Sequence, residues 1–147
     1  MHIGPDENTP PYGTPSPFLT KSGELLPVTL VLIASRLIEG LTGQTELGIQ
    51  EGQVRSVGEP SYRRLDCDRR ALAYVRIRPK HGFVRVDVSG LWAVPRPTPL
   101  LHPRAMGQVV LLLRQKEDVD EALRYLGQAV RATRRALTPA RGGGTIQ

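Results

Sequence analysis

The strongest constraint on the fold is a run of alternating apolar and polar residues on both sides of a short loop, at residues 70–89. Before the loop, Ala71, Ala73, Val75 and Ile77 alternate with Leu72, Tyr74, Arg76 and Arg78; after it, Val84, Val86 and Val88 alternate with Phe83, Arg85 and Asp87. Successive side chains of a strand point to opposite faces, so the pattern predicts an antiparallel hairpin with one apolar and one polar face. If residues 79–82 form the loop, Arg78 lies opposite Phe83, Arg76 opposite Arg85, and Tyr74 opposite Asp87.

A helix is expected on each side of this hairpin in the sequence. In the first, over residues 27–41, apolar side chains at positions 30, 34, 37, 38 and 41 form one stripe, with Gly43 as the stop signal. The second helix is predicted to begin with Asp118 as N-cap and Glu121 three residues later, and to end near Leu137. Its apolar stripe is Val119, Ala122, Leu123, Leu126 and Val130, with Leu137 at the end. Acidic residues at its start and Arg131, Arg134 and Arg135 near its end complement the helix dipole without requiring a ligand.

The remaining elements are predicted less sharply. Residues 46–50, 53–57 and 61–65 read as short strands or turns separated by glycines. Residues 109–113 are all apolar, which predicts a strand buried on both faces and central in the sheet. Four prolines make residues 95–107 a long connection, and Trp92 is expected to cap one end of the core. The fold class is therefore α+β: a small, mainly antiparallel sheet with an N-terminal and a C-terminal helix packed on it.

Length and composition fit a single core in a chain of 147 residues. We expect a Pro-rich arm at residues 1–24, one α+β domain at 25–138 and a Gly-rich tail at 139–147. The first residues do not resemble a secretory signal, and the longest apolar run, 25–34, is about half the roughly 20 residues a membrane helix needs. Cys67 is the one cysteine, so no internal disulfide can form. A cytoplasmic location without membrane attachment is expected.

The net charge of +6 conceals an uneven distribution. Residues 1–60 carry three basic and seven acidic side chains, a net of −4, whereas residues 61–147 carry seventeen basic and seven acidic ones, a net of +10. Such a field attracts polyanions, among them nucleic acid, acidic proteins and anionic surfaces. The alternative is that the excess of Arg reflects composition alone.

The predicted hairpin face and its surroundings supply a candidate nucleic-acid-binding set: Arg63, Arg64, Tyr74, Arg76, Arg78, Lys80, Phe83 and Arg85. Aromatic rings can stack on bases while guanidinium groups neutralise phosphates. The competing interpretation is an ordinary solvated sheet face. One detail favours a ligand: Arg76 opposite Arg85 is a repulsive pair unless an anion or Asp87 lies between them.

Signatures of catalysis are not found in the sequence. It contains neither a metal-ligand pattern nor a Gly-rich nucleotide-binding motif, so we expect no cofactor and no catalytic or metal-binding residue. Cys67 lies between two carboxylates, which should raise its pKa and weaken it as a nucleophile. A divalent-metal nuclease using Asp66 and Asp68 remains an alternative, although two Asp residues at a turn more often serve the turn itself.

Residues 61–130 resemble a small domain family of unknown function described as a predicted transport protein, which is often fused to restriction or DNA-modification modules. The resemblance lies in the hairpin sequence from Ala71 to Val88, the strand at 109–113 and the helix bearing Val119, Leu123, Tyr125 and Leu126. It implies a non-enzymatic accessory module and supplies no catalytic residue.

Together these features predict a non-enzymatic binding module that engages a polyanion such as DNA or RNA through the Arg-rich hairpin. The alternative is a protein-interaction or homo-oligomerisation module that does not bind nucleic acid.

Overall fold

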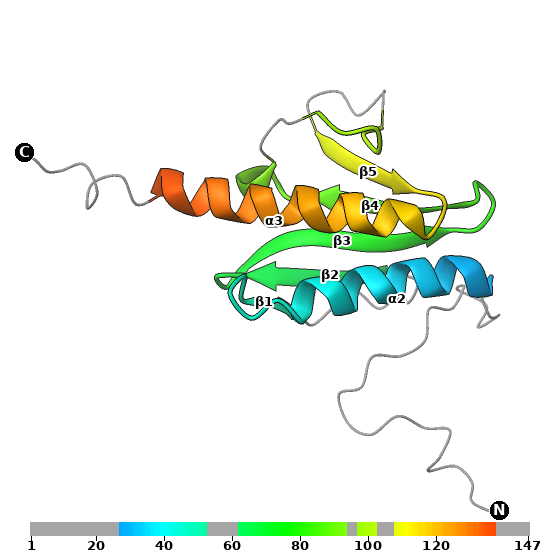
Figure 1. Ribbon diagram of the computed structural model, residues 1–147, viewed down its shortest axis with the longest axis horizontal. Helices are drawn as coiled ribbons and strands as arrows, with labels where there is room; N and C mark the ends of the chain where they lie inside the picture. Colours follow the sequence, from blue (N-terminus) through cyan, green and yellow to red (C-terminus); the bar gives the residue numbers. More distant parts are fainter. Residues whose placement is uncertain (1–26, 53–61, 94–96, 103–107, 138–147) are drawn as a thin grey trace, which may run out of the picture.

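The computed structural model describes residues 27–52, 62–93, 97–102 and 108–137 (Figure 1). The expected arm at 1–24, the tail at 139–147 and the possible strand at 53–57 lie outside these residues. Within them the chain forms an antiparallel sheet with two long helices, which confirms the α+β prediction.

The sheet has five strands, and their order in space is their order in the sequence. They are β1 (Ile49–Glu51), β2 (Tyr62–Cys67), β3 (Arg70–Arg78), β4 (Phe83–Val88) and β5 (Val109–Leu113). The predicted register of the β3–β4 hairpin is confirmed: Arg78 pairs with Phe83, Arg76 with Arg85, and Tyr74 with Asp87. The period-two pattern and the four-residue loop were therefore sufficient to fix this register.

The β2–β3 hairpin contains two irregularities. Its turn residues Asp68 and Arg69 both have positive φ, 54° and 67°, as a two-residue type I′ turn requires. The register then shifts between Leu65 and Asp66, so that Leu72 is an extra residue in β3. Such a bulge increases the local twist of the strand.

Helices α2 (Val28–Thr42) and α3 (Glu117–Leu137) lie on the same face of the sheet, in front of it in Figure 1. Every predicted stripe residue of α2 is buried, and the helix ends one residue before Gly43. In α3 the stripe is buried as far as Val130 except for the partly buried Leu123, whereas Leu137 is exposed. These side chains pack on the apolar sheet residues, which include Ala73, Val75, Ile77, Val84 and Val86.

The predicted N-cap of α3 is wrong. The helix begins at Glu117, and Asp118 lies in its first turn. The Asp118 carboxylate instead accepts hydrogen bonds from the preceding backbone N–H groups of Arg114 and Gln115, at 2.8 and 3.2 Å. Glu121 does not complete a capping box, because it accepts from Thr98 and Arg124.

The predicted central position of β5 is also wrong, although the burial of all five of its residues is confirmed. β5 is the last strand of the sheet. Its outer edge is covered by residues 100–102: the Leu112 N–H donates to the Leu100 carbonyl, and the His102 N–H donates to the Val110 carbonyl, both at 2.8 Å. This short segment therefore shields part of the free edge of β5 from pairing with another strand.

Trp92 lies in the 3₁₀ helix η1 (Gly90–Trp92) and is fully buried, as expected for a residue that caps the core. Among the described residues, no helix combines the length and apolar character needed to cross a membrane.

Candidate functional site

The sheet face opposite the helices is polar. We define this polar face as Tyr62, Arg64, Tyr74, Arg76, Arg78, Phe83, Arg85 and Asp87, which share one side by the register of β2, β3 and β4. All eight side chains are partly buried. No helix of the described segments covers this side of the sheet.

The register aligns these residues in rows across the strands. One row runs Arg64, Tyr74, Asp87, Val110, and the next runs Tyr62, Arg76, Arg85, Leu112. Each row thus combines partly exposed charged and aromatic side chains and ends at a buried aliphatic residue of β5. A ligand crossing the strands would meet both kinds of group within one row.

Aromatic and guanidinium groups are in direct contact on this face. The rings of Tyr62 and Tyr74 are stacked, with centroids 5.8 Å apart and an interplanar angle of 20°. The guanidinium carbon of Arg76 lies 5.1 Å from the Tyr62 ring centroid, and that of Arg114 lies 5.4 Å from the Phe83 centroid. At this range the cation is attracted by the ring quadrupole and its planar group is held in place.

Carboxylates neutralise part of the positive charge. Nε of Arg64 lies 2.6 Å from Asp66, and Nε of Arg85 lies 2.9 Å from Asp87. The hydrogen bond that Arg64 donates to Asp66 raises the pKa of Arg64. Both pairs are at least a quarter exposed, so they orient the guanidinium groups more than they stabilise the fold.

The end of the β3–β4 hairpin keeps its positive charge. Within the described segments, Arg78, Lys80 and Arg114 form no ion pair with a carboxylate. Lys80 and Arg114 are exposed, and Arg114 lies against Phe83, the partner of Arg78 in the register. This end is the strongest candidate for a phosphate contact.

Six of the predicted binding residues lie on the polar face, and two do not. Arg63 pairs with Val75 in the register and therefore belongs to the helix-covered side, where its side chain donates to both carboxylate oxygens of Glu51. Lys80 lies in the exposed loop between β3 and β4. Two residues that the sequence analysis did not select also belong to the site: Tyr62 on the polar face and Arg114 at its hairpin end. They were missed because the sequence did not define the register of β2 or the start of α3.

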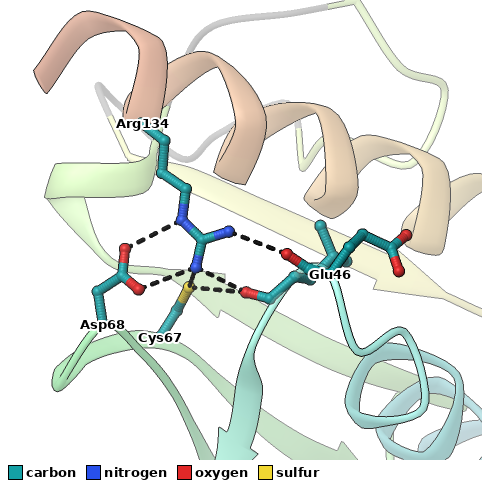
Figure 2. Close-up of polar contacts among 5 residues, drawn as sticks. Glu46, Cys67, Asp68 and Arg134 are labelled. Atoms are coloured by element: carbon teal, nitrogen blue, oxygen red, sulfur yellow. Dashed lines mark hydrogen bonds and ion pairs between the residues drawn. The ribbon is translucent and has the colours of Figure 1, made fainter. Parts of the chain in front are cut away.

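A second polar cluster surrounds Arg134, at the end of α3 (Figure 2). The guanidinium group donates to the carboxylate of Asp68, with Nη2–Oδ1 at 2.8 Å, and to the carbonyl oxygens of Glu46 and Leu47. It also touches the Cys67 sulfur at 3.4 Å. One side chain thus ties α3 to the β2–β3 turn and to the segment before β1.

This cluster shifts the pKa values of Cys67 and Asp68. The Cys67 side chain is buried, and its burial raises the thiol pKa; the nearby Asp68 raises it further, whereas Arg134 lowers it. The expected increase is present, but burial is its main cause. The hydrogen bond from Arg134 lowers the pKa of Asp68.

The nuclease alternative requires Asp66 and Asp68 to act together. In the structure, each of them forms an ion pair with a different Arg. Asp66 binds Arg64 on β2, whereas Asp68 in the turn binds Arg134. The described part of the chain contains no group of three or more His, Cys, Asp or Glu side chains arranged to hold a metal ion.

Comparison with known proteins gave no match to any family model, curated protein or solved structure.

Proposed function

We propose that this chain is a non-catalytic module that binds single-stranded nucleic acid, RNA or DNA, on its polar face. The observation that carries the proposal is the contact of Arg76 with Tyr62, which itself stacks on Tyr74. Guanidinium and aromatic groups on adjoining strands match the two components of a nucleic-acid strand, its phosphates and its bases.

Base stacking favours single strands over duplexes as the ligand. Unpaired bases can be splayed onto a flat sheet and stacked on aromatic rings, whereas the bases of a duplex are already stacked on one another. The partly buried rings of Tyr62, Tyr74 and Phe83 provide such a surface. The cations at the hairpin end, Arg78, Lys80 and Arg114, can bind the phosphates of the strand. No carboxylate in the described part of the chain neutralises them.

The proposal is tested by fluorescence anisotropy with a labelled single-stranded RNA octamer over a range of salt concentrations. The triple variant Arg76→Ala, Arg78→Ala, Arg114→Ala should bind much more weakly. The slope of log affinity against log salt should fall by about two, because each phosphate contact on a single strand contributes roughly 0.7.

A second triple variant controls for net charge. Arg36→Ala, Arg124→Ala, Arg131→Ala removes the same three charges from exposed positions on the helices. It should retain most of the affinity and of the salt slope. Equal losses in the two triple variants would show that the polar face has no special role, and an octamer that does not bind the unaltered chain at low salt would overturn the proposal. A dimer that persists at high salt, combined with no octamer binding, would point to the oligomerisation alternative.

A further inference from the structure

A pocket of about 430 Å³ opens at one end of the polar face. It is lined by Tyr74, Asp87, Ser89, Gln108 and Val110, together with Val88, Val109, Gly90 and Ala93. Its volume falls within the range of roughly 300–1,000 Å³ typical of small-ligand sites, so it can hold one nucleoside.

The pocket adjoins the stacked tyrosines. Tyr74 contributes to its wall and also stacks on Tyr62, and in the register Asp87 lies between Tyr74 and Val110. A strand that stacks one base on the tyrosine pair can therefore place a neighbouring base in the pocket.

Within the described residues, the polar groups of the pocket have hydrogen-bonding capacity that no other side chain uses. Asp87 Oδ1 accepts from Arg85 Nε at 2.9 Å, and the carboxylate is 30% exposed, so its second oxygen can accept another hydrogen bond. Ser89 and Gln108 make no side-chain hydrogen bond within the described part of the chain. A carboxylate is an acceptor only, which means that its ligand must present a donor.

We propose that this pocket binds one nucleobase bearing an exocyclic amino group, which donates to Asp87. Cytosine and uracil test this requirement because they have nearly the same shape. Cytosine presents an amino donor at C4, where uracil presents a carbonyl acceptor that would face the carboxylate. The inference rests on the proposed binding of single-stranded nucleic acid and adds a base preference to it.

The experiment compares anisotropy titrations of labelled oligocytidine and oligouridine octamers against the full chain. We expect oligocytidine to bind about tenfold more tightly, a ratio in line with one good base contact. Asp87→Asn should reduce the ratio to about one, because an amide can donate to uracil as well as accept from cytosine.

Asp66→Asn is the matched control. Asp66 forms the same type of pair with an Arg two residues away on the polar-face side of β2, but it does not line the pocket. Both substitutions remove one negative charge and should change the overall affinity alike. Only the ratio of the affinities for oligocytidine and oligouridine therefore reports on the pocket. The ratio should remain near ten in Asp66→Asn.

The two proposals fail in different ways. Equal binding of the octamers, still strongly weakened by the Arg76, Arg78 and Arg114 triple variant, would overturn the pocket and leave nucleic-acid binding intact. The same would follow if the two Asp variants changed the ratio alike. Failure of the chain to bind either octamer would overturn the binding function and the pocket with it.

Discussion

Arg76 and Arg85 lie directly opposite each other on β3 and β4. Like charges in this position destabilise a sheet, typically by a fraction of a kcal/mol. Asp87 binds Arg85, and the Tyr62 ring lies under Arg76, so the surrounding groups offset the repulsion. The fold therefore compensates this pair with its own side chains, and the pair does not by itself require an anionic ligand.

The first prediction separates binding from stability at this pair. Arg76→Thr should change the free energy of unfolding by less than about 1 kcal/mol, because relief of the repulsion roughly offsets the lost contact with Tyr62. Octamer binding should nevertheless weaken. Urea unfolding and anisotropy measure the two effects, and Val75→Thr provides the contrast: a hydroxyl at this fully buried position should cost about 1–3 kcal/mol. A loss of 2 kcal/mol or more in Arg76→Thr would show that Arg76 is structural.

The second prediction concerns the Arg134 cluster. Arg134→Ala should destabilise the chain by about 1–3 kcal/mol, since it removes hydrogen bonds to Asp68 and to two backbone carbonyls. Arg131→Ala, one helical turn earlier, should cost less than about 0.5 kcal/mol. Arg131 is exposed, and its Nη2 lies 3.5 Å from Glu46 Oε2, so this surface ion pair contributes little to stability. Chemical denaturation of the two variants provides the comparison. Equal costs would refute the connecting role of Arg134.

The third prediction concerns pH. Arg134 holds the pKa of Asp68 below its ordinary value, so the contribution of this carboxylate to stability is fully present above the unfolded pKa of about 4 and is lost as the pH falls through the lower folded pKa. The free energy of unfolding should therefore fall more between pH 6 and pH 3 in the unaltered chain than in Asp68→Asn. We expect the difference to be less than about 1 kcal/mol, because Asp68 is half exposed. A variant with the same or a steeper loss would contradict the assignment.

The fourth prediction concerns the β2–β3 turn. Arg69 has a φ of 67°, a left-handed conformation that costs a residue with a side chain roughly 1 kcal/mol. Arg69→Gly creates the Asp-Gly sequence favoured in type I′ turns and should stabilise the chain by about 0.5–1 kcal/mol. Arg69→Ala should not, because alanine keeps the steric conflict. Thermal unfolding followed by circular dichroism distinguishes the two, and equal melting temperatures in the two variants would argue against strain at this position.

Much of the fold was predictable because it depends on local periodicity. The period-two pattern of residues 71–88 fixed the β3–β4 hairpin and its register, and the apolar stripes fixed the two helices to within a few residues. Local chemistry was less reliable at the boundaries. Asp118 has the sequence context of an N-cap, yet its carboxylate binds backbone groups that precede the helix.

The candidate site was predictable only where it lies within one hairpin. Tyr74, Arg76, Phe83 and Arg85 alternate in sequence, and this alternation alone assigns them to one face. The positions of Arg63, Tyr62 and Arg114 depend on how β2 pairs with β3 and where β5 ends. Neither the bulged pairing of β2 with β3 nor the end of β5 follows from the period-two pattern of the β3–β4 hairpin.

The sequence by itself determined an α+β chain with one strongly amphipathic hairpin, because side-chain direction in a strand or helix follows from residue spacing. Only the tertiary structure decided that β5 is an edge strand covered by residues 100–102, that Arg63 and not Arg64 lies on the helix-covered side of the sheet, and that Arg134 reaches the β2–β3 turn. The physical reason is that these features arise from contacts between separate elements of the chain. Their geometry depends on the packing of the whole sheet and its helices, which no local spacing encodes.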